Sequence, residues 1–182
     1  MKVYKISPYT GEKHAYIENT GHSWDVIDAI IDGERIEEHS VDLRKMVLKN
    51  KTKLYPDLLG TGSTEYFVSE PLRLFIEQNV KHQPINFIEV TIADKKYWLL
   101  NIIGLRNCMD YEQSTYTVYE KVNKPDQITK LVVREDKLYE LDLFRLLDRP
   151  EIVFVTEPLK KALDKEGFTG IRYFDNMDLT KI

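Results

Sequence analysis

An eight-residue segment near the middle of the chain, Asn-Cys-Met-Asp-Tyr-Glu-Gln-Ser, combines more reactive side chains than any other. If it is an extended strand, alternate residues share one face, which then carries Cys108, Asp110, Glu112 and Ser114. Two carboxylates this close repel each other, which separates their pKa values and would allow one to act as an acid and the other as a base. The same carboxylates are suited to accept hydrogen bonds from a base such as Arg145, or simply to face water. Structural pairing is the commoner fate, so the segment favours a polar network over an acid–base site.

Other reactive residues give weaker patterns. Cys108 is the only cysteine and has no histidine near it in the sequence, so it is better interpreted as a small buried apolar residue than as a nucleophile. His22 with Asp25 and Asp28 has a spacing that suits a divalent metal on one helix face. No second histidine follows at ligand spacing, and a solvated acidic face is favoured. The chain lacks G-x-S-x-G, H-E-x-x-H, Walker and Rossmann patterns, so no cofactor and no metal is expected.

A run of acidic residues precedes the middle of the chain. It holds a single base, Arg35, and its six carboxylates are those of Asp25, Asp28, Asp32, Glu34, Glu37 and Glu38. Such a run steers a basic protein partner toward the surface, whereas ordinary solvation accounts for most acidic runs. These six residues are our candidates for partner binding.

Composition places the chain among ordinary globular proteins. Its 182 residues are 42% apolar and 31% charged, which excludes a disordered or low-complexity chain. One cysteine excludes a disulfide framework. With 26 basic and 30 acidic side chains, a net charge of −4 argues against a nucleic-acid partner. The longest apolar run, Tyr97 to Leu105, is half a membrane span, and the N-terminus has no apolar secretory segment, so we expect a cytoplasmic location and no membrane contact.

Periodicity and turn residues define the elements that would position these side chains. We expect strands at 1–6, 66–68, 87–93, 97–103, 108–117, 128–133, 152–155 and 171–174, and helices over 70–78 and 157–166. Residues 55–63 are expected to form a loop, 141–147 a short strand or a turn of helix, and 22–48 either a helix or a hairpin. In the last of these segments, Trp24, Ile27, Ile30 and Ile31 recur at helical spacing.

One short sequence occurs twice. Phe-Val-Ser-Glu-Pro-Leu-Arg at 67–73 returns 87 residues later as Phe-Val-Thr-Glu-Pro-Leu-Lys, with five of seven positions identical. A shared capping rule is one explanation, and two similar strand–helix units packed on related sheets is the favoured one. The fold class predicted is therefore α+β, a mostly antiparallel sheet with two strand–helix–strand units, in a single compact domain over 1–182.

The order of motifs along the chain carries a family resemblance. The motifs are Pro56-Asp57-Leu58-Leu59 with Gly60 and Gly62, Val68-Ser69-Glu70-x-Leu72, Phe87-x-x-Val90, the Tyr97–Ile102 strand, Cys108-x-Asp110-x-Glu112-x-Ser114, Phe144-Arg145-Leu146, Phe154–Lys160 and Gly167–Phe174. From about residue 55 to 175 the chain resembles the family-eleven immunity proteins of bacterial polymorphic toxin systems. Residues 1–54 match no pattern and are interpreted as an N-terminal extension of the same domain.

The resemblance implies a non-enzymatic protein that binds and neutralises a dedicated toxin in the cytoplasm, as a monomer or a homodimer. We expect the toxin to be encoded by a neighbouring gene. It supplies no catalytic residues. It assigns Ser69 and Thr156 as helix caps and Gly167 as a helix stop, and it leaves Asp110, Glu112 and Arg145 as a shared polar network or a surface. Two other functions stay open, a small hydrolase or lyase that uses Asp110 and Glu112, and a ligand-sensing domain.

Overall fold

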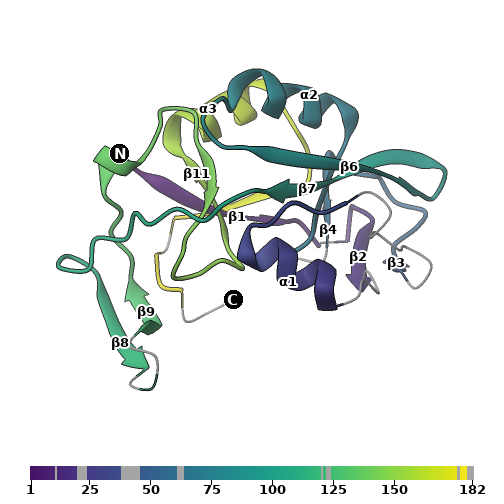
Figure 1. Cartoon of the computed structure of the whole chain (residues 1–182). Helices are drawn as coiled ribbons and strands as arrows, with labels where there is room; N and C mark the ends of the chain where they lie inside the picture. The colour runs from purple at the N-terminus through teal and green to yellow at the C-terminus, as the bar shows by residue number, and fades with distance from the viewer. Residues whose placement is uncertain are drawn as a thin grey trace.

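Two four-stranded antiparallel sheets form the body of the protein in the computed structural model (Figure 1). The model describes residues 1–10, 12–19, 24–37, 46–60, 64–119, 121, 124–175 and 177–179. One sheet has the order β10 (Leu143–Arg145), β11 (Val153–Thr156), β1 (Val3–Pro8), β12 (Ile171–Phe174). The other has the order β4 (Leu58–Gly60), β5 (Tyr66–Val68), β7 (Lys95–Ile102), β6 (Ile85–Ile92). The α+β class expected from the sequence is confirmed.

Smaller elements complete the fold. Two-stranded sheets pair β2 (Tyr16–Asn19) with β3 (Val47–Lys49) and β8 (Thr115–Tyr119) with β9 (Lys124–Lys130). The helices are α1 (Trp24–Asp32), α2 (Glu70–Asn79) and α3 (Glu157–Glu166), with a 3₁₀ turn η2 (Glu135–Lys137). The segment left open between helix and hairpin is thus helical in its first part. No described helix is long and apolar enough to cross a membrane.

The repeated sequence marks two equivalent units. β5 leads into α2 in one sheet, and β11 leads into α3 in the other. Both helices pack on one shared core through Leu72 and Ile76 of α2 and Leu159 and Leu163 of α3, and they lie side by side along the upper edge of Figure 1. The repeat therefore reflects a duplicated strand–helix unit, as expected.

The two units differ at their helix starts. Ser69 accepts a hydrogen bond from the backbone N–H of Leu72 at 3.4 Å, the interaction expected of an N-cap. The Thr156 hydroxyl makes no cap bond; it donates to the carbonyl of Glu140 at 2.6 Å and accepts the N–H of Asp142 at 3.2 Å. The assignment of Thr156 as a helix cap is wrong for its side chain, because a neighbouring loop offers it better partners.

Strand β7 is covered on both faces, which explains the apolar run from Tyr97 to Leu100 within it. Trp98 and Leu100 face the core beneath the helices, whereas Tyr97 and Leu99 face a second core that includes residues of α1. Alternate residues of a strand point to opposite sides, so a strand buried twice has no polar face. The hairpin of β6 and β7 is confirmed, with Ile85 opposite Ile102 at one end.

Two expectations about extended segments are wrong. Leu58 and Leu59, expected in a loop, form β4 and are buried against β5. The expected strand over 108–117 begins only at Thr115, because residues 111–114 form a turn. Strand propensity does not predict this turn, because backbone N–H groups of the turn donate hydrogen bonds to the Asp110 side chain.

Candidate functional site

Helix α1 presents the acidic run on one side of the molecule. Val26 and Ile30, one turn apart, are buried and attach the helix to the body. Asp25, Asp28 and Asp32 follow the opposite face at spacings of three and four residues, and all three are exposed. The helix thus separates an apolar attachment side from a charged outer side.

The chain continues the acidic surface past the end of α1. Glu34, Arg35 and Glu37 are exposed, while Ile36 between them is buried. The backbone here is fixed to the large hairpin, since the Asn101 amide donates to the carbonyl of Glu34 at 2.7 Å and the N–H of Ile36 donates to the Asn86 side chain at 3.1 Å. The charged side chains are therefore held on a rigid edge.

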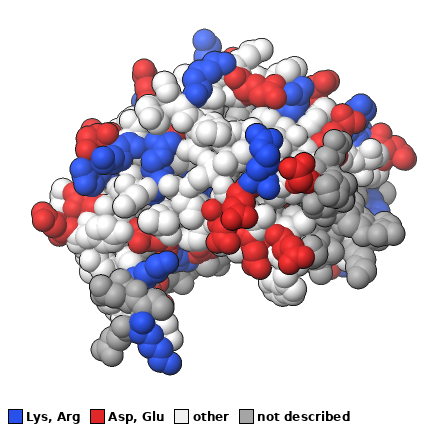
Figure 2. All heavy atoms as spheres, in the orientation of Figure 1, with Lys and Arg blue, Asp and Glu red and all other residues white. Residues whose placement is uncertain are grey.

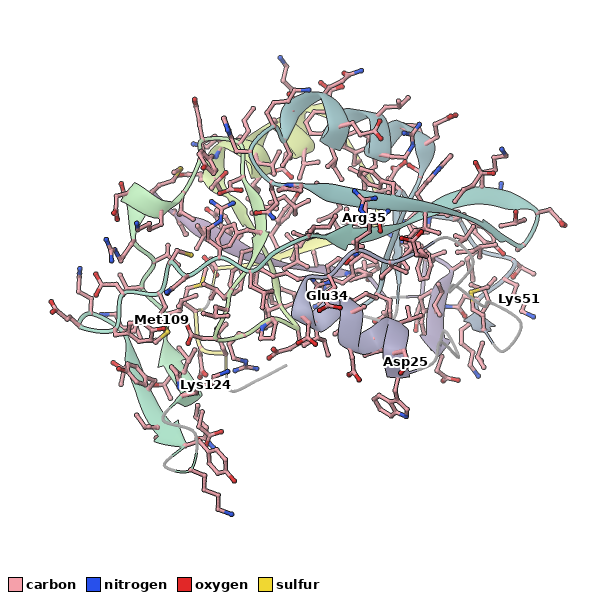
Figure 3. The ribbon with its side chains drawn as sticks, viewed as in Figure 1. Asp25, Glu34, Arg35, Lys51, Met109 and Lys124 are labelled. Carbon is pink, nitrogen blue, oxygen red and sulfur yellow. The ribbon has the colours of Figure 1, made fainter. Side chains whose placement is uncertain are left out.

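We call the exposed carboxylates of Asp25, Asp28, Asp32, Glu34 and Glu37 the acidic face. Figure 2 shows a concentration of acidic atoms over this region, and Figure 3 shows Asp25 at the start of α1 with Glu34 and Arg35 past its end. None of the five forms an ion pair with a described cation. Glu38, the sixth predicted carboxylate, lies outside the described residues.

Asp32 is poorly placed for helix stability. It lies in the last turn of α1, which contains no basic residue. A carboxylate at this negative end of the helix dipole is unfavourable by about 0.3–1 kcal/mol. The position of Asp32 is therefore not explained by helix stability, whereas Asp25, in the first turn, lies at the end of the helix dipole that favours a carboxylate.

Trp24 adds an apolar group beside the acidic face. Its side chain is 76% exposed, the largest exposure among the bulky apolar residues described. The sequence pattern grouped Trp24 with Ile27, Ile30 and Ile31 at helical spacing, but the buried residues of α1 are Val26 and Ile30, and Trp24 is the first residue of the helix. An exposed tryptophan next to carboxylates is a feature that sequence analysis missed.

The segment with reactive side chains has a structural role. One Asp110 carboxylate oxygen accepts the N–H groups of Glu112 and Gln113 at 3.1 and 3.0 Å, and the other accepts the Gln113 amide at 2.7 Å. Ser114 exchanges hydrogen bonds with the backbone of Val132 through its hydroxyl. Asp110 and Ser114 thus close the turn at the base of the β8–β9 hairpin, while the Glu112 side chain is exposed.

Arg145 lies apart from that turn. It is fully buried, and its guanidinium donates to the carbonyls of Pro150 at 2.6 Å and Thr64 at 2.9 Å. Burial lowers the pKa of Arg145, which the neighbouring Tyr66 and Glu151 partly offset. The structure thus unites three members of the predicted polar network at one turn and gives the fourth different partners.

Two further hypotheses from the sequence concern Cys108 as a nucleophile and a metal site at His22. Burial raises the pKa of the Cys108 thiol to about 12, so the thiolate needed of a nucleophile is not formed at neutral pH. Among the described residues no group of three or more His, Cys, Asp or Glu side chains is arranged to hold a metal ion. His22 falls outside the described residues, so its pairing with Asp25 and Asp28, the less favoured interpretation, is not tested.

The match of nearly the whole sequence to a family model decides the family of the protein. The model of an immunity protein family, Imm11, matches residues 7–178, nearly the full length of the chain. The chain belongs to the Imm11 immunity protein family. The match begins well before residue 55, so the N-terminal part, which had shown no pattern, belongs to the family domain too. No curated protein matches the chain significantly.

Membership of the Imm11 family implies a toxin as partner and an inhibitor's role rather than a catalyst's. The acidic face lies inside the matched residues, as does the turn at Asp110. Because an inhibitor acts by binding its partner, its functional residues are expected on the exposed surface.

A polar cleft on the Imm11 domain was not foreseen. Its volume is about 490 Å³, and Arg106 lies along it, paired with the buried Asp142 at 3.1 Å and lying over the Tyr139 ring at 5.0 Å. The Arg106 guanidinium also donates to the side chain of Gln83 and the carbonyl of Lys137. With its donors satisfied inside the protein, Arg106 fixes η2 to the sheet rather than offering a free charge.

Proposed function

We propose that this protein binds a cognate bacterial toxin in the cytoplasm and neutralises it by covering its active site or substrate groove with the acidic face. The observation that carries the proposal is the set of five exposed carboxylates that have no described cation as partner. Family membership supplies the class of partner.

Electrostatics make a basic surface the natural complement. Carboxylates held at close spacing repel one another, and a partner that brings lysines or arginines relieves this repulsion while it speeds encounter. A toxin that acts on nucleic acid has such a groove, because its substrate is a polyanion. We therefore infer a nuclease-like toxin whose substrate channel receives α1.

Co-expression with the product of the neighbouring gene tests the partner. We expect a stoichiometric complex on affinity purification and survival of cells that otherwise die from that product. A folded protein that neither binds nor protects would contradict the immunity function, and loss of a catalytic turnover in Asp110→Asn would instead support the hydrolase alternative.

Charge reversal tests the surface. Asp25→Lys with Asp28→Lys should slow association at least tenfold at low salt and flatten its dependence on ionic strength. Glu140→Lys with Glu166→Lys changes the net charge equally at two exposed positions away from α1 and is the matched control. Equal effects of the two pairs would place the toxin on another surface and leave the immunity function standing.

A further inference from the structure

The two four-stranded sheets have the same internal arrangement. In the first sheet, β4 and β5 are followed along the chain by α2, β6 and β7, and the spatial order is β4-β5-β7-β6. In the second sheet, β10 and β11 are followed by α3 and β12, and the spatial order is β10-β11-β1-β12. All these pairings are antiparallel. β1 therefore occupies in the second sheet the place that β7 occupies in the first.

The registers of the strands agree as well. Val68 lies between β4 and β7, where it pairs with Trp98. Its counterpart in the repeated sequence, Val155, lies between β10 and β1, where it pairs with Tyr4. All four residues belong to the core that the two sheets share with α2 and α3. The correspondence thus extends beyond the repeated sequence to strands that show no sequence similarity.

Contacts of the two helices with the sheets also recur at equivalent positions. The guanidinium of Arg73 on α2 lies 4.8 Å from the centre of the Trp98 ring. The ammonium of Lys160, its counterpart on α3, lies 5.5 Å from the centre of the Tyr4 ring. Each cation also pairs with the carboxylate four residues later in its own helix. A shared helix-start signal requires none of these contacts, so the sequence repeat is part of a larger duplication.

We propose that the chain consists of two copies of one ββαββ unit, that β1 closes the second copy, and that the connections between the copies, residues 9–57 and 103–142, carry the surface that binds the toxin. In the first copy all five elements are consecutive, whereas the last strand of the second copy comes from the other end of the sequence. The role of the connections rests on the proposed function, whereas the duplication and the place of β1 rest on the fold alone.

The two connections occupy equivalent places. Residues 9–57 follow β1 and cover the first sheet with side chains such as Val26, on the face turned away from α2 and α3. Residues 103–142 follow β7 and cover the second sheet in the same way with side chains such as Ile128. Figure 1 shows α2 and α3 along the top of the molecule, with α1 and the β8–β9 hairpin below the sheets. Each connection therefore leaves one copy and covers the other.

Exposed groups suited to a protein interface are concentrated in the connections. All five carboxylates of the acidic face lie in residues 9–57. Of the nine large apolar residues that are exposed in the described chain, seven lie in the connections, and only Leu74 and Leu147 lie in the copies. Protein interfaces are built from such apolar groups surrounded by charged and polar ones. This distribution favours the copies as the scaffold and the connections as the binding surface.

A circular permutant tests the duplication. It begins at Lys95, runs to residue 182 and continues through a glycine–serine linker into residues 1–94. The two ends can be joined by a short linker, because Lys2 Nζ lies 3.6 Å from an Asp175 carboxylate oxygen. The permutant opens the exposed turn between β6 and β7, so β7 becomes the first strand, as β1 is in the natural chain. If the copies are equivalent, the order of elements is unchanged.

We expect this permutant to unfold in urea in one cooperative transition. A second permutant, opened between the exposed residues Lys81 and His82, is the control. Its ends lie inside a copy, between α2 and β6, so it should unfold at a lower urea concentration. A permutant starting at Lys95 that is no more stable than this control would overturn the equivalence of the copies.

Hydrogen exchange of the natural chain tests the place of β1 and the role of the connections. β1 is paired on both sides, as β7 is, so its amides should exchange within about tenfold of those in β7. Exchange roughly a hundredfold faster in β1 would overturn its closing role. Added toxin, the product of the neighbouring gene, should slow exchange at residues 24–37 and leave α2 and α3 unchanged. Slowing on α2 or α3 would overturn the role of the connections alone, whereas a toxin that does not bind would contradict the proposed function and leave the duplication standing.

Discussion

The backbone N–H of Gly104, just past the end of β7, donates a hydrogen bond of 2.7 Å to the carbonyl of Gly33, just past the end of α1. Gly33 has a φ of +69°, and a Cβ added there would lie 2.8 Å from the Gly104 nitrogen. This contact sets how closely the end of α1 approaches the sheet. The glycine pair thus adds to the buried side of α1 and to the Asn101 and Asn86 hydrogen bonds in positioning the acidic face.

Gly33→Ala should destabilise the protein by about 2–4 kcal/mol, because left-handed strain and a backbone collision add. Gly167→Ala is the matched control, since Gly167 has a φ of +75° but its added Cβ would meet nothing within 4 Å. Gly167→Ala should lower the free energy of unfolding only by the strain of the left-handed conformation, about 1 kcal/mol. Urea unfolding measures both, and equal losses would show that the collision is relieved by movement of the helix.

The two helix starts should respond differently to loss of their hydroxyls. Thr156→Val leaves a partly buried carbonyl on Glu140 and a buried N–H on Asp142 unpaired, and should cost about 1–3 kcal/mol. Ser69→Ala removes one long cap bond and a bond of 2.7 Å to Asp57, and should cost about 1 kcal/mol. Thermal unfolding compares them. A larger loss for Ser69→Ala would mean that the Glu140 carbonyl and the Asp142 N–H find other partners when the Thr156 hydroxyl is removed.

Helices α2 and α3 and the central hairpin could be predicted because their signals are local. Ser69 with Pro71 marks a helix start, Gly167 in a left-handed conformation ends α3, and Asp94 turns one strand into the next. The short strand β4 could not be recognised, since Leu58 and Leu59 are strand residues only through pairing with β5. Its neighbouring proline and glycines are typical of a loop.

Some residues of the candidate site could be predicted and others could not, again because only local signals are visible in the sequence. The exposure of the acidic residues on α1 could be predicted, because charged side chains are rarely buried and the charge is known from the sequence. The fate of Arg145 depends on carbonyls at Thr64 and Pro150, and Thr64 is distant in sequence. The exposure of Trp24 depends on where α1 begins, which a hydrophobic pattern fixes only to within a turn.

High pH should destabilise the protein through buried groups with raised pKa values, among them Tyr66 and Cys108. Burial raises the pKa of Tyr66 from 10.0 to about 12 and that of Cys108 from 9.0 to about 12. The folded protein keeps both protons after the unfolded chain has lost them. The free energy of unfolding is therefore unaffected below pH 9 and falls as the pH rises toward 12, by about 1.4 kcal/mol per group and pH unit.

Two variants separate these contributions. Cys108→Ala should flatten the loss that starts near pH 9, and Tyr66→Phe the loss that starts near pH 10, at the cost of the Tyr66 bond to the carbonyl of Ile6. Urea unfolding at pH 7, 9, 10 and 11 measures the slopes, with Tyr119→Phe as an exposed control. Identical slopes in all four proteins would show that other groups govern alkaline unfolding.

Asp110 should matter for the turn rather than for a reaction. Asp110→Asn keeps an oxygen that can accept the N–H groups of Glu112 and Gln113, so most of the stability should remain. Asp110→Ala removes the acceptor and should cost about 1–2 kcal/mol. Chemical unfolding of both variants checks this order, and a fully stable Asp110→Ala protein would contradict the structural role.

Trp24 should contribute to binding and not to folding. Its side chain is 76% exposed, so Trp24→Ala should change the free energy of unfolding by less than about 0.5 kcal/mol. Tryptophans at interfaces often supply 2 kcal/mol or more, so the affinity for the toxin should fall about thirtyfold or further. Leu54→Ala, at another strongly exposed apolar residue, is the control. Calorimetric titration of the toxin measures both, and equal affinities would remove Trp24 from the interface while leaving the carboxylates of the acidic face to be tested by their own charge reversal.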